Sequence, residues 1–364
     1  MTALNTYRRW LARVEDDALR AELSALDEVR DAAQIEDRFY RDLAFGTGGL
    51  RGVLGAGTNR MNVYVVRRAT QGLAAYLKAA GLPLRCAIAY DSRIGSARFA
   101  RETARVLAAN GVTAYLYPRL EPTPALSWAV RYYGCGAGVC VTASHNPAAY
   151  NGYKVYGPDG CQITSDAAAE ISERIARLGY FPAEGAESAK IDDYQQACFD
   201  GRISWIGEDT LARFMDAVLE QSQETPEESA EPIRVLYTPL CGTGLECVSQ
   251  VLGRIGIPYL DVVPGQDQPD GDFPTCEYPN PEERAALQAG IDKCRSWKEM
   301  GKPFDLLLAT DPDADRVGIA MKCPDGSYEL VTGNEVGVLL LDYICAGRIE
   351  KGTMPEKPVA VKSI

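Results

Sequence analysis

Two short segments of this sequence hold side chains that could do chemistry together. The first follows the apolar run Gly138–Val141 and contains Ser144, His145 and Asn146, with Lys154 ten residues after the serine. It places a hydroxyl beside an imidazole and near an ammonium group, which suits nucleophilic or acid–base chemistry. Ser, Asn, Pro and Gly are also the usual residues of a turn. The histidine favours a functional segment, because it is the only one in the chain.

The second segment is rich in carboxylates. Asp311, Asp313 and Asp315 follow the apolar run Leu306–Ala309 at alternate positions, which puts three carboxylates on one side of an extended segment. Their mutual repulsion favours a bound cation, and hard oxygen ligands suit Mg²⁺. A solvated acidic turn is the alternative. An EF-hand fits poorly because its sixth position is Arg316 rather than glycine.

A third segment, Phe45–Gly52, is a glycine-rich loop that ends in Leu50, Arg51 and Gly52. Its glycines could offer backbone N–H groups to a phosphate, and the guanidinium of Arg51 could bind one by two hydrogen bonds. The segment has neither the dinucleotide nor the P-loop spacing, so a structural loop is an equal alternative. The segment Asp91–Arg93 is typical of a helix entry.

The charges of the three segments complement one another. A phosphorylated serine and three aspartates would carry about five negative charges, of which Mg²⁺ offsets only a part. Arg51, Lys154 and Arg316 are the cations available for the rest. A hydroxyl, a metal site and cationic side chains serve phosphoryl transfer, which depends on positioning and charge stabilisation.

Strand–helix–strand patterns predict the elements that position these segments. An apolar run at 86–90 precedes a helical stretch over 97–109 and the run at 112–117, and Asn110-Gly111 ends the helix. The pattern returns with a strand at 234–240 and another at 259–263. The sequence therefore predicts an α/β fold class with two similar domains in tandem, mixed sheets covered by helices, and ligands at the carboxyl ends of strands.

Two further segments precede or join these domains. Leu19, Leu23 and Leu26 have helical spacing among charged residues and predict an amphipathic N-terminal helix. Residues 220–232 are polar, acidic and proline-containing, which is typical of a solvated connection.

A third region is expected to start near residue 323. Residues 323–330 predict a hairpin, residues 334–346 a helix, and residues 359–364 the first strand of a further unit. We expect the chain to stop inside that unit.

Composition limits the class of protein. The chain has 364 residues, 38 basic against 50 acidic side chains and a net charge of −12, which argues against binding to nucleic acid or anionic membrane. It lacks a long apolar stretch and a signal-peptide core, which predicts a soluble, cytoplasmic protein. Eleven cysteines without a C-x-x-C pair predict reduced thiols.

The motifs together resemble a known family. TASHNP followed by NGYK, DPDADR, and FGTGGLRG resemble the α-D-phosphohexomutases, in particular the phosphoglucomutase and phosphomannomutase group. The longer form GTGGLRG-x-x-GAGTNRMN is similar to the branch with bacterial phosphoglucomutases and the phosphoglucomutase-2 and phosphopentomutase type. The resemblance runs from about Ala44 to the end of the chain.

The resemblance implies four domains around a deep cleft, three of them with one α/β fold. Residues 1–207 would be domain I with the phosphoserine loop, residues 208–322 domain II with the metal loop, and residues 323–364 the start of domain III. Domain IV, with its site for the distal phosphate, would be absent. We therefore expect a truncated chain with little or no mutase activity.

The resemblance also implies an isomerase of carbohydrate and glucose metabolism that acts as a phosphoprotein. Ser144 would carry the phosphoryl group between hexose 1-phosphate and hexose 6-phosphate, with glucose 1,6-bisphosphate as intermediate and activator. The implied Mg²⁺ ligands are Asp311, Asp313, Asp315 and a phosphate oxygen on Ser144. The residues implied near the transferring phosphate are Arg51, His145, Asn146, Lys154 and Arg316. Proton transfer and charge stabilisation both remain open for His145 and Lys154.

Other activities remain alternatives. The preferred sugar phosphate could be that of glucose, mannose or a pentose, and the oligomeric state is open. A fragment that binds Mg²⁺ and sugar phosphate without catalysis is an alternative of another class. Asp313 and Asp315 also fit the D-x-D-x-V motif of haloacid-dehalogenase-type phosphatases, with Asp313 as nucleophile. Only 49 residues follow Asp315 and none of them forms an adjacent acidic pair, so this alternative is disfavoured.

Overall fold

The computed structural model describes residues 2–182, 187–223 and 232–361. The chain divides into two compact units. Unit 1 holds Met1–Thr210 and Asp270–Asp272, and unit 2 holds Leu211–Pro269 and Phe273–Ile364. Among the described residues, no helix combines the length and the apolar character that crossing a membrane requires.

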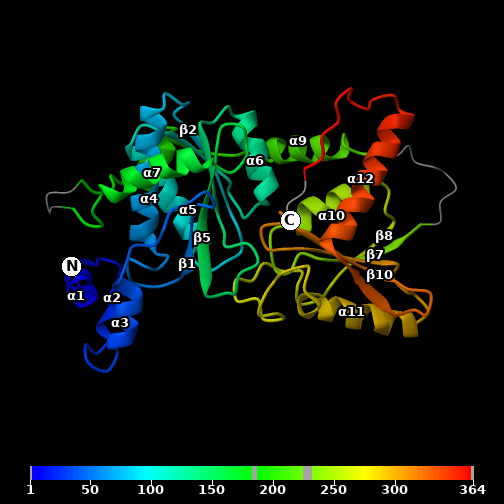
Figure 1. Ribbon diagram of the computed structural model, residues 1–364, viewed down its shortest axis with the longest axis horizontal. Coiled ribbons are helices and arrows are strands. Elements are labelled where there is room, and N and C mark those ends of the chain that lie inside the picture. Colours follow the sequence, from blue (N-terminus) through cyan, green and yellow to red (C-terminus); the bar gives the residue numbers. More distant parts are fainter. Residues whose placement is uncertain (1, 183–186, 224–231, 362–364) are drawn as a thin grey trace. The chain divides into compact units, whose positions relative to one another are not determined.

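Unit 1 is built on a six-stranded mixed sheet (Figure 1). In spatial order its strands are β1 (Leu50–Val53), β5 (Tyr150–Tyr156), β4 (Ala137–Val141), β2 (Arg85–Tyr90), β3 (Thr113–Leu116) and β6 (Ile203–Trp205). The four strands from β4 to β6 are parallel neighbours, whereas β5 is antiparallel to both β4 and β1. The strand predicted at 86–90 is confirmed as β2.

Helices cover both faces of this sheet. They are α4 (Val63–Ala79), α5 (Ser96–Ala109), α6 (Thr123–Tyr132), α7 (Ser165–Ala176) and the short α8 (Tyr194–Phe199). The hydroxyl of Tyr153 lies 3.0 Å from that of Thr70 on α4. Gly138 faces the other side of the sheet, where α6 lies so close that a Cβ would overlap the side chain of Val130. The helix predicted over 97–109 is confirmed as α5, and Gly111 with φ +71° follows its end.

Three short helices precede this sheet: α1 (Ala3–Arg13), α2 (Asp17–Ser24) and α3 (Ala32–Phe39). Trp10 of α1 is 1% exposed and packs among aromatic rings, which attaches these helices to the body of unit 1. The predicted amphipathic helix forms as α2 and buries Leu23, but it ends before Leu26. The side chain of Asp27 accepts the backbone N–H groups of Val29 and Arg30, which favours a turn at this point over a continued helix.

Unit 2 repeats the central topology of unit 1 on a five-stranded sheet. In spatial order its strands are β11 (Tyr328–Val331), β10 (Val317–Lys322), β9 (Leu306–Thr310), β7 (Arg234–Thr238) and β8 (Tyr259–Val262). Its helices are α9 (Glu208–Leu219, which starts in unit 1), α10 (Leu245–Arg254), α11 (Arg284–Glu299) and α12 (Gly333–Glu350). Strands β9, β7 and β8 are parallel, and β10 is antiparallel to β9, as β5 is to β4. The α/β class with two similar mixed sheets is confirmed.

The structure departs from the sequence analysis near the end of the chain. The predicted hairpin forms, but its second strand, β11, pairs with β10 and extends the second sheet past residue 322. Helix α12 is longer than the predicted 334–346. Thr332 and Glu335 form a capping box that fixes its start at Gly333, and the helix continues to Glu350. Residues 359–361 form no strand, since no strand in the described part of the chain pairs with them. Residues 362–364, and most of the predicted connection 220–232, lie outside the described residues.

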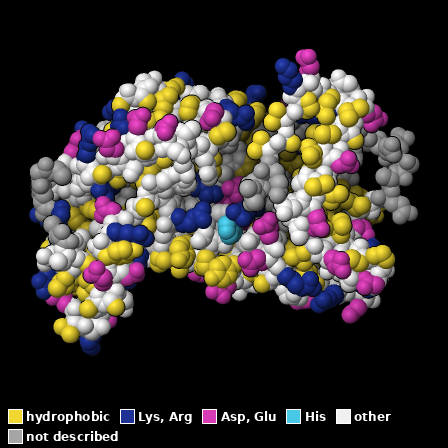
Figure 2. Space-filling view, viewed as in Figure 1, with side chains coloured by type: hydrophobic (Ala, Val, Ile, Leu, Met, Phe, Trp, Pro, Cys, Tyr) yellow, Lys and Arg dark blue, Asp and Glu magenta, His cyan; other side chains and the backbone are white. Residues whose placement is uncertain are grey.

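Helix α12 is apolar but not buried. Val338 is 68% exposed, Leu339 is 56% exposed, and no residue of the helix is classed as buried. Figure 2 shows the corresponding yellow side chains gathered over this helix. Its hydrophobic composition therefore does not reflect packing inside unit 2.

None of the eleven cysteines, all of which lie within the described residues, forms a disulfide. Several are in the core, and burial raises the pKa of Cys135 to about 12. These buried thiols therefore act as small apolar side chains rather than as nucleophiles.

Candidate active site

Ser144 lies in a tight loop directly after β4. The hydroxyl oxygen of Thr142 accepts the backbone N–H of Ser144 at 2.8 Å, a local bond that short hydroxyl side chains favour in turns. Ser144 adopts φ +53°, in the left-handed region, and the residue is only 3% exposed. A left-handed conformation in a non-glycine residue costs energy and is often found at functional sites.

The single histidine lies against this serine. The Oγ of Ser144 is 3.2 Å from Nδ1 of His145, within hydrogen-bond reach. His145 is half-buried, and Figure 2 shows the histidine ring, in cyan, reaching the surface. The imidazole can therefore contact both the serine oxygen and a bound molecule.

Arg51 joins this group from β1. Its Nη1 donates to Oδ1 of Asn146 at 2.9 Å, so the structure brings these two predicted phosphate-binding residues together. Arg51 is exposed and pairs in register with Gly152 of β5. A Cβ at Gly152 would overlap the carbonyl oxygen of Thr142, so only glycine lets β5 pass this close to the serine loop.

The glycine-rich loop does not present all its amides as the sequence suggested. The N–H groups of Gly46 and Gly49 each donate to the carbonyl oxygen of the other, at 3.0 and 2.8 Å. A Cβ at Gly49 would overlap the backbone of Tyr153. These glycines therefore let the chain pass close to β5, and Arg51 is the phosphate-binding candidate of this segment.

Lys154 is a buried lysine on β5. It is 4% exposed and pairs in register with Cys140 of β4, four residues before Ser144. Lysines are rarely buried to this extent, which makes Lys154 a functional-site candidate.

Sequence reasoning missed Arg93, which the segment Asp91–Arg93 had indicated only as a helix entry. Its guanidinium donates to backbone carbonyls of the serine loop, among them that of Ser144 at 2.6 Å. The available signal was its position directly after β2, at the carboxyl edge where α/β sheets bind ligands.

The three predicted metal ligands of unit 2 lie together. Asp311, Asp313 and Asp315 each offer a carboxylate oxygen within 4.8 Å of the others. Asp311 and Asp313 are fully buried, whereas Asp315 is exposed. Two buried carboxylates this close to a third repel one another unless a cation lies between them, and an all-oxygen donor set fits Mg²⁺.

Asp311 also organises the backbone of its own loop. Its Oδ1 accepts the N–H groups of Asp315 at 3.1 Å and Arg316 at 3.0 Å, while Ala314 adopts φ +52°. These bonds turn the chain so that the carboxylate of Asp315 faces back toward that of Asp311. The side chain of Arg316 is exposed at the end of this turn.

The carboxylate loop rests on the loop that follows β7. The N–H of Thr243 donates to the carbonyl of Pro312 at 2.9 Å, and a Cβ at Gly242 would overlap the backbone of Pro312. The side chain of Gln266 is fully buried, and its Oε1 accepts the hydroxyl of Thr238 at 2.7 Å. This bond helps to hold the loop that follows β7. Backbone packing therefore positions the predicted metal ligands.

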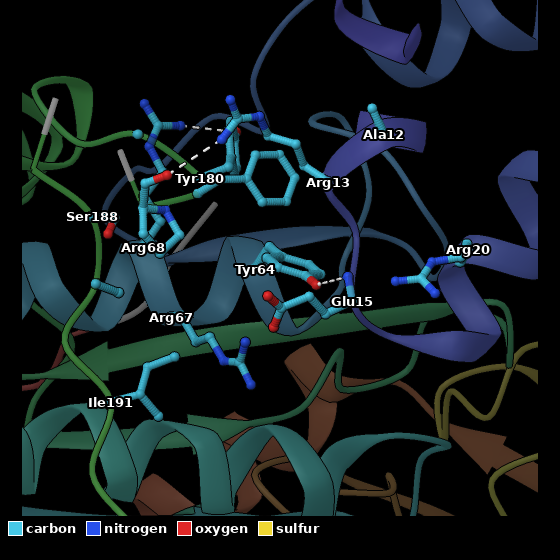
Figure 3. Close-up of a pocket in the computed structure, with 14 residues that line it drawn as sticks. Ala12, Arg13, Glu15, Arg20, Tyr64, Arg67, Arg68, Tyr180, Ser188 and Ile191 are labelled. Carbon is cyan, nitrogen blue, oxygen red and sulfur yellow. Dashed lines mark hydrogen bonds between the residues drawn. The ribbon is translucent and has the colours of Figure 1, made fainter. Parts of the chain in front are cut away.

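A cavity of about 620 Å³ in unit 1 also holds arginines but is built differently (Figure 3). Arg67 is ion-paired with Glu102, and Arg68 is bonded to Asp42 and to the hydroxyl of Tyr180. Arg67 thus links α4 to α5, and Arg68 links α4 to the loops that contain Asp42 and Tyr180. The cavity is therefore a poorer candidate for phosphate than the serine loop.

Two models of one family match the two sheet-containing regions of the chain. "Phosphoglucomutase/phosphomannomutase, alpha/beta/alpha domain I" matches residues 42–180, and the corresponding domain II matches residues 212–326, together more than half of the chain. The chain belongs to this family, within the α-D-phosphohexomutase superfamily. Ser144 lies in the first matched region and the three aspartates lie in the second.

Curated relatives of this phosphohexomutase-family chain bear three different substrate names. A phosphoglucomutase of Staphylococcus haemolyticus is 33% identical over 98% of this chain and 61% of its own length. A probable phosphoribomutase of Schizosaccharomyces pombe is 35% identical over 92% of this chain and 56% of its own. A probable phosphomannomutase of Haemophilus influenzae is 38% identical over 78% and 55%. The chain thus spans about three fifths or less of these relatives.

Solved structures agree on the fold. A putative phosphomannomutase from Thermus thermophilus superimposes with a TM-score of 0.62 at 23% identity, over 86% of this chain and 62% of the other. This likeness supports the architecture of the phosphohexomutase fold and no more than that.

Proposed function

We propose that this chain carries the phosphoryl-transfer centre of a sugar phosphomutase, with Ser144 as the phosphoryl carrier. The observation that carries the proposal is the loop after β4. There a nearly buried serine in a left-handed conformation has its Oγ 3.2 Å from an imidazole. This loop lies in the region that matches family domain I.

The proposed reaction moves one phosphoryl group in each half. A hydroxyl of the sugar monophosphate attacks the phosphorus of phosphorylated Ser144, so the bond from phosphorus to Oγ breaks and a bond to the sugar oxygen forms. The hydroxyl proton passes to a neighbouring base, and His145 or Lys154 can take it. In the second half, Oγ of Ser144 attacks the phosphorus of the other phosphoryl group of the resulting bisphosphate. The bond from that phosphorus to the sugar oxygen breaks, and the proton held by the base passes to that sugar oxygen. No water is consumed, so the net change is an isomerisation.

Cationic side chains would balance the charge that shifts during transfer. Arg51 is exposed and already bonded to Asn146 beside the serine, so its remaining donors can bind phosphate oxygens. Where His145 is the base, Lys154 adds a compact positive charge from β5. Arg316 is proposed to bind phosphate from unit 2.

The three aspartates fit a resident Mg²⁺. Asp311, Asp313 and Asp315 would hold the ion. When bound, the ion would supply positive charge that stabilises the transferring phosphoryl group. Asp311 also holds its loop through two backbone N–H groups, so the ligand geometry is largely fixed in advance.

We further propose hexose 1-phosphate and hexose 6-phosphate as the substrate pair, with glucose 1,6-bisphosphate as the intermediate. The names of the relatives leave mannose and pentose phosphates as alternatives. Initial rates of protein phosphorylation by glucose 1,6-bisphosphate, mannose 1,6-bisphosphate and ribose 1,5-bisphosphate would rank the three, because this half of the reaction does not require full mutase turnover. A specificity constant highest for ribose would move the assignment to a phosphopentomutase.

Intact-protein mass spectrometry tests the central proposal. Incubation with glucose 1,6-bisphosphate and Mg²⁺ should add one phosphate, and peptide mapping should place it on Ser144. Ser144→Ala should lower labelling by more than about 10³-fold, as expected when a nucleophile is removed. Asp313→Asn serves as the matched control for the phosphatase alternative. Label that is released by hydroxylamine and lost only in that variant would assign the nucleophile to Asp313 instead.

A further inference from the structure

One side chain holds the serine loop from behind. Arg93 follows β2, and its Nη2 donates to the carbonyl oxygens of Ser144, at 2.6 Å, and Asn146. Its Nη1 donates to the carbonyls of Pro147 at 2.9 Å and Tyr150 at 3.1 Å. A single guanidinium thus fastens four backbone carbonyls of one loop.

The guanidinium itself is fixed by a buried network. Its Nε faces Oδ2 of Asp91 at 3.3 Å, and both side chains are fully buried. Oδ1 of Asp91 accepts the hydroxyl of Ser96 at 2.7 Å, and that hydroxyl oxygen accepts from the amide of Asn151 at 3.0 Å. The start of α5 and the start of β5 therefore both fix the position of Arg93.

This network explains how Ser144 can keep its conformation. A left-handed residue other than glycine costs about 1–3 kcal/mol and persists only where its surroundings fix it. Thr142 binds the N–H of Ser144 and Arg93 binds its carbonyl oxygen, so both peptide groups of the serine are held. Without the second bond, the peptide that joins Ser144 to His145 loses the donor that fixes its carbonyl oxygen.

We propose that Arg93 is the positioning residue of the phosphoryl carrier. It touches no substrate, and it acts by holding the backbone that aims Oγ of Ser144. The inference rests on the proposed function of Ser144. Lysine cannot replace arginine here, because one ammonium nitrogen cannot reach four carbonyls in the planar pattern that two Nη atoms provide.

A matched pair of variants separates positioning from plain stability. Arg93 and Arg68 are both buried arginines of unit 1, at 2% and 8% exposure, and Arg68 instead joins Asp42 and Tyr180. Arg93→Lys should slow the phosphorylation of Ser144 by glucose 1,6-bisphosphate about 100-fold, the scale of a misplaced reacting group. The half-saturating concentration of glucose 1,6-bisphosphate should stay within about threefold of the wild-type value. Arg68→Lys should lower the thermal midpoint but leave the rate constant unchanged.

Hydrogen exchange gives a readout that does not depend on the activity. Amides of the segment 142–150 should exchange at least about tenfold faster in Arg93→Lys than in the wild type, and no faster in Arg68→Lys. If Arg93→Lys does not fold, Asp91→Asn replaces it, because it keeps the guanidinium and loosens only its anchor. The same segment should then exchange faster, and phosphorylation should slow by a smaller factor.

The outcomes separate the two proposals. Unchanged exchange of segment 142–150 in the folded variant, or a phosphorylation rate equal to that of the wild type, would overturn the role of Arg93. A wild-type chain that takes no label on Ser144 would overturn the proposed function. In that case the exchange data would still decide whether Arg93 orders the loop.

Discussion

The loop after β4 and the loop after β9 occupy the same place in two similar sheets. Each joins a parallel strand to an antiparallel one, and each contains one non-glycine residue in the left-handed region. In the first loop that residue is Ser144, the proposed nucleophile, with φ +53°. In the second it is Ala314, with φ +52°, and carboxylates flank it. One backbone design thus presents a hydroxyl in unit 1 and a charged ligand set in unit 2.

The two loops differ in what holds them. A side chain, Arg93, binds the carbonyls of the serine loop. Backbone contact with Gly242 and Thr243 supports the aspartate loop, and the carboxylate of Asp311 binds N–H groups of its own loop. The difference teaches that both loops combine internal bonds with an outside donor, but the outside donor is a side chain, Arg93, for the serine loop and a backbone N–H, that of Thr243, for the aspartate loop.

The largest expected effect concerns the charge of the aspartate loop. Asp313→Asn should lower Mg²⁺ affinity at least about tenfold in calorimetry, since even changes outside the ligand set commonly cost that much. Saturation at 100 times the dissociation constant should stabilise the wild type by about 2.7 kcal/mol and the variant far less. The control is Asp292→Asn on the exposed face of α11. Equal Mg²⁺ affinity in all three proteins would show that the aspartates do not form the metal site.

The next effect tests whether backbone packing supports the aspartate loop. A Cβ at Gly242 would overlap backbone atoms of Pro312, so Gly242→Ala should lower the free energy of unfolding by about 1–3 kcal/mol and weaken Mg²⁺ binding. Gly253→Ala is the control, because a Cβ there meets nothing within 4 Å in α10. That change should be neutral or stabilise by up to about 1 kcal/mol. Urea denaturation measures the free energy of unfolding of both variants. Equal losses of stability in the two variants would contradict the special role of Gly242.

A third effect tests the local bond of the serine loop. Thr142→Val removes the acceptor for the buried N–H of Ser144 and should cost about 1–3 kcal/mol, while Thr142→Ser keeps the acceptor. Phosphorylation should slow in the valine variant and stay near the wild-type rate in the serine variant. Equal rates in the two variants would mean that the bond to Thr142 does not position Ser144.

The smallest effect concerns an ion pair of the second sheet outside both loops. Burial tends to raise the pKa of Asp305, but hydrogen bonds from Lys322 and from the N–H of Arg234, with the charge of Lys322, outweigh it and lower the pKa. The carboxylate therefore adds stability above its unfolded pKa of about 3.9, and this is lost as the pH falls through the lower folded value.

Thermal unfolding between pH 3 and pH 7 measures this contribution. Asp305→Asn should lower the midpoint by no more than about 3 °C near pH 7, because Asp305 and Lys322 are each about one third exposed and solvent screens the pair. The difference should close toward pH 3. A gap that stays constant with pH would mean that the ionised carboxylate contributes nothing.

Much of the fold could be predicted because its signals are local. The apolar run at 86–90 and the helical stretch over 97–109 appear as β2 and α5 within a residue at each end. The three aspartates were also foreseeable as a group, since alternate positions in a short loop cannot place them far apart. Their roles, and those of Ser144, His145, Lys154, Arg51 and Arg316, stay predictions.

Other features depend on residues that are distant in the sequence. Arg93 is 51 positions from Ser144, and only the parallel pairing of β2 with β4 brings them together. Similarly, Gly242 meets Pro312 because β7 pairs with β9. No local pattern marks either contact.

The sequence by itself determined the family and the α/β elements, and it singled out the candidate reactive side chains, because propensity, hydrophobic period and motif spacing all act over a few residues. Only the tertiary structure decided what holds those side chains in place. Hydrogen bonding between strands far apart in the chain sets which loops lie together at the edge of a sheet. Asp91 and Arg93, whose segment the sequence indicated only as a helix entry, are buried there and support the serine loop.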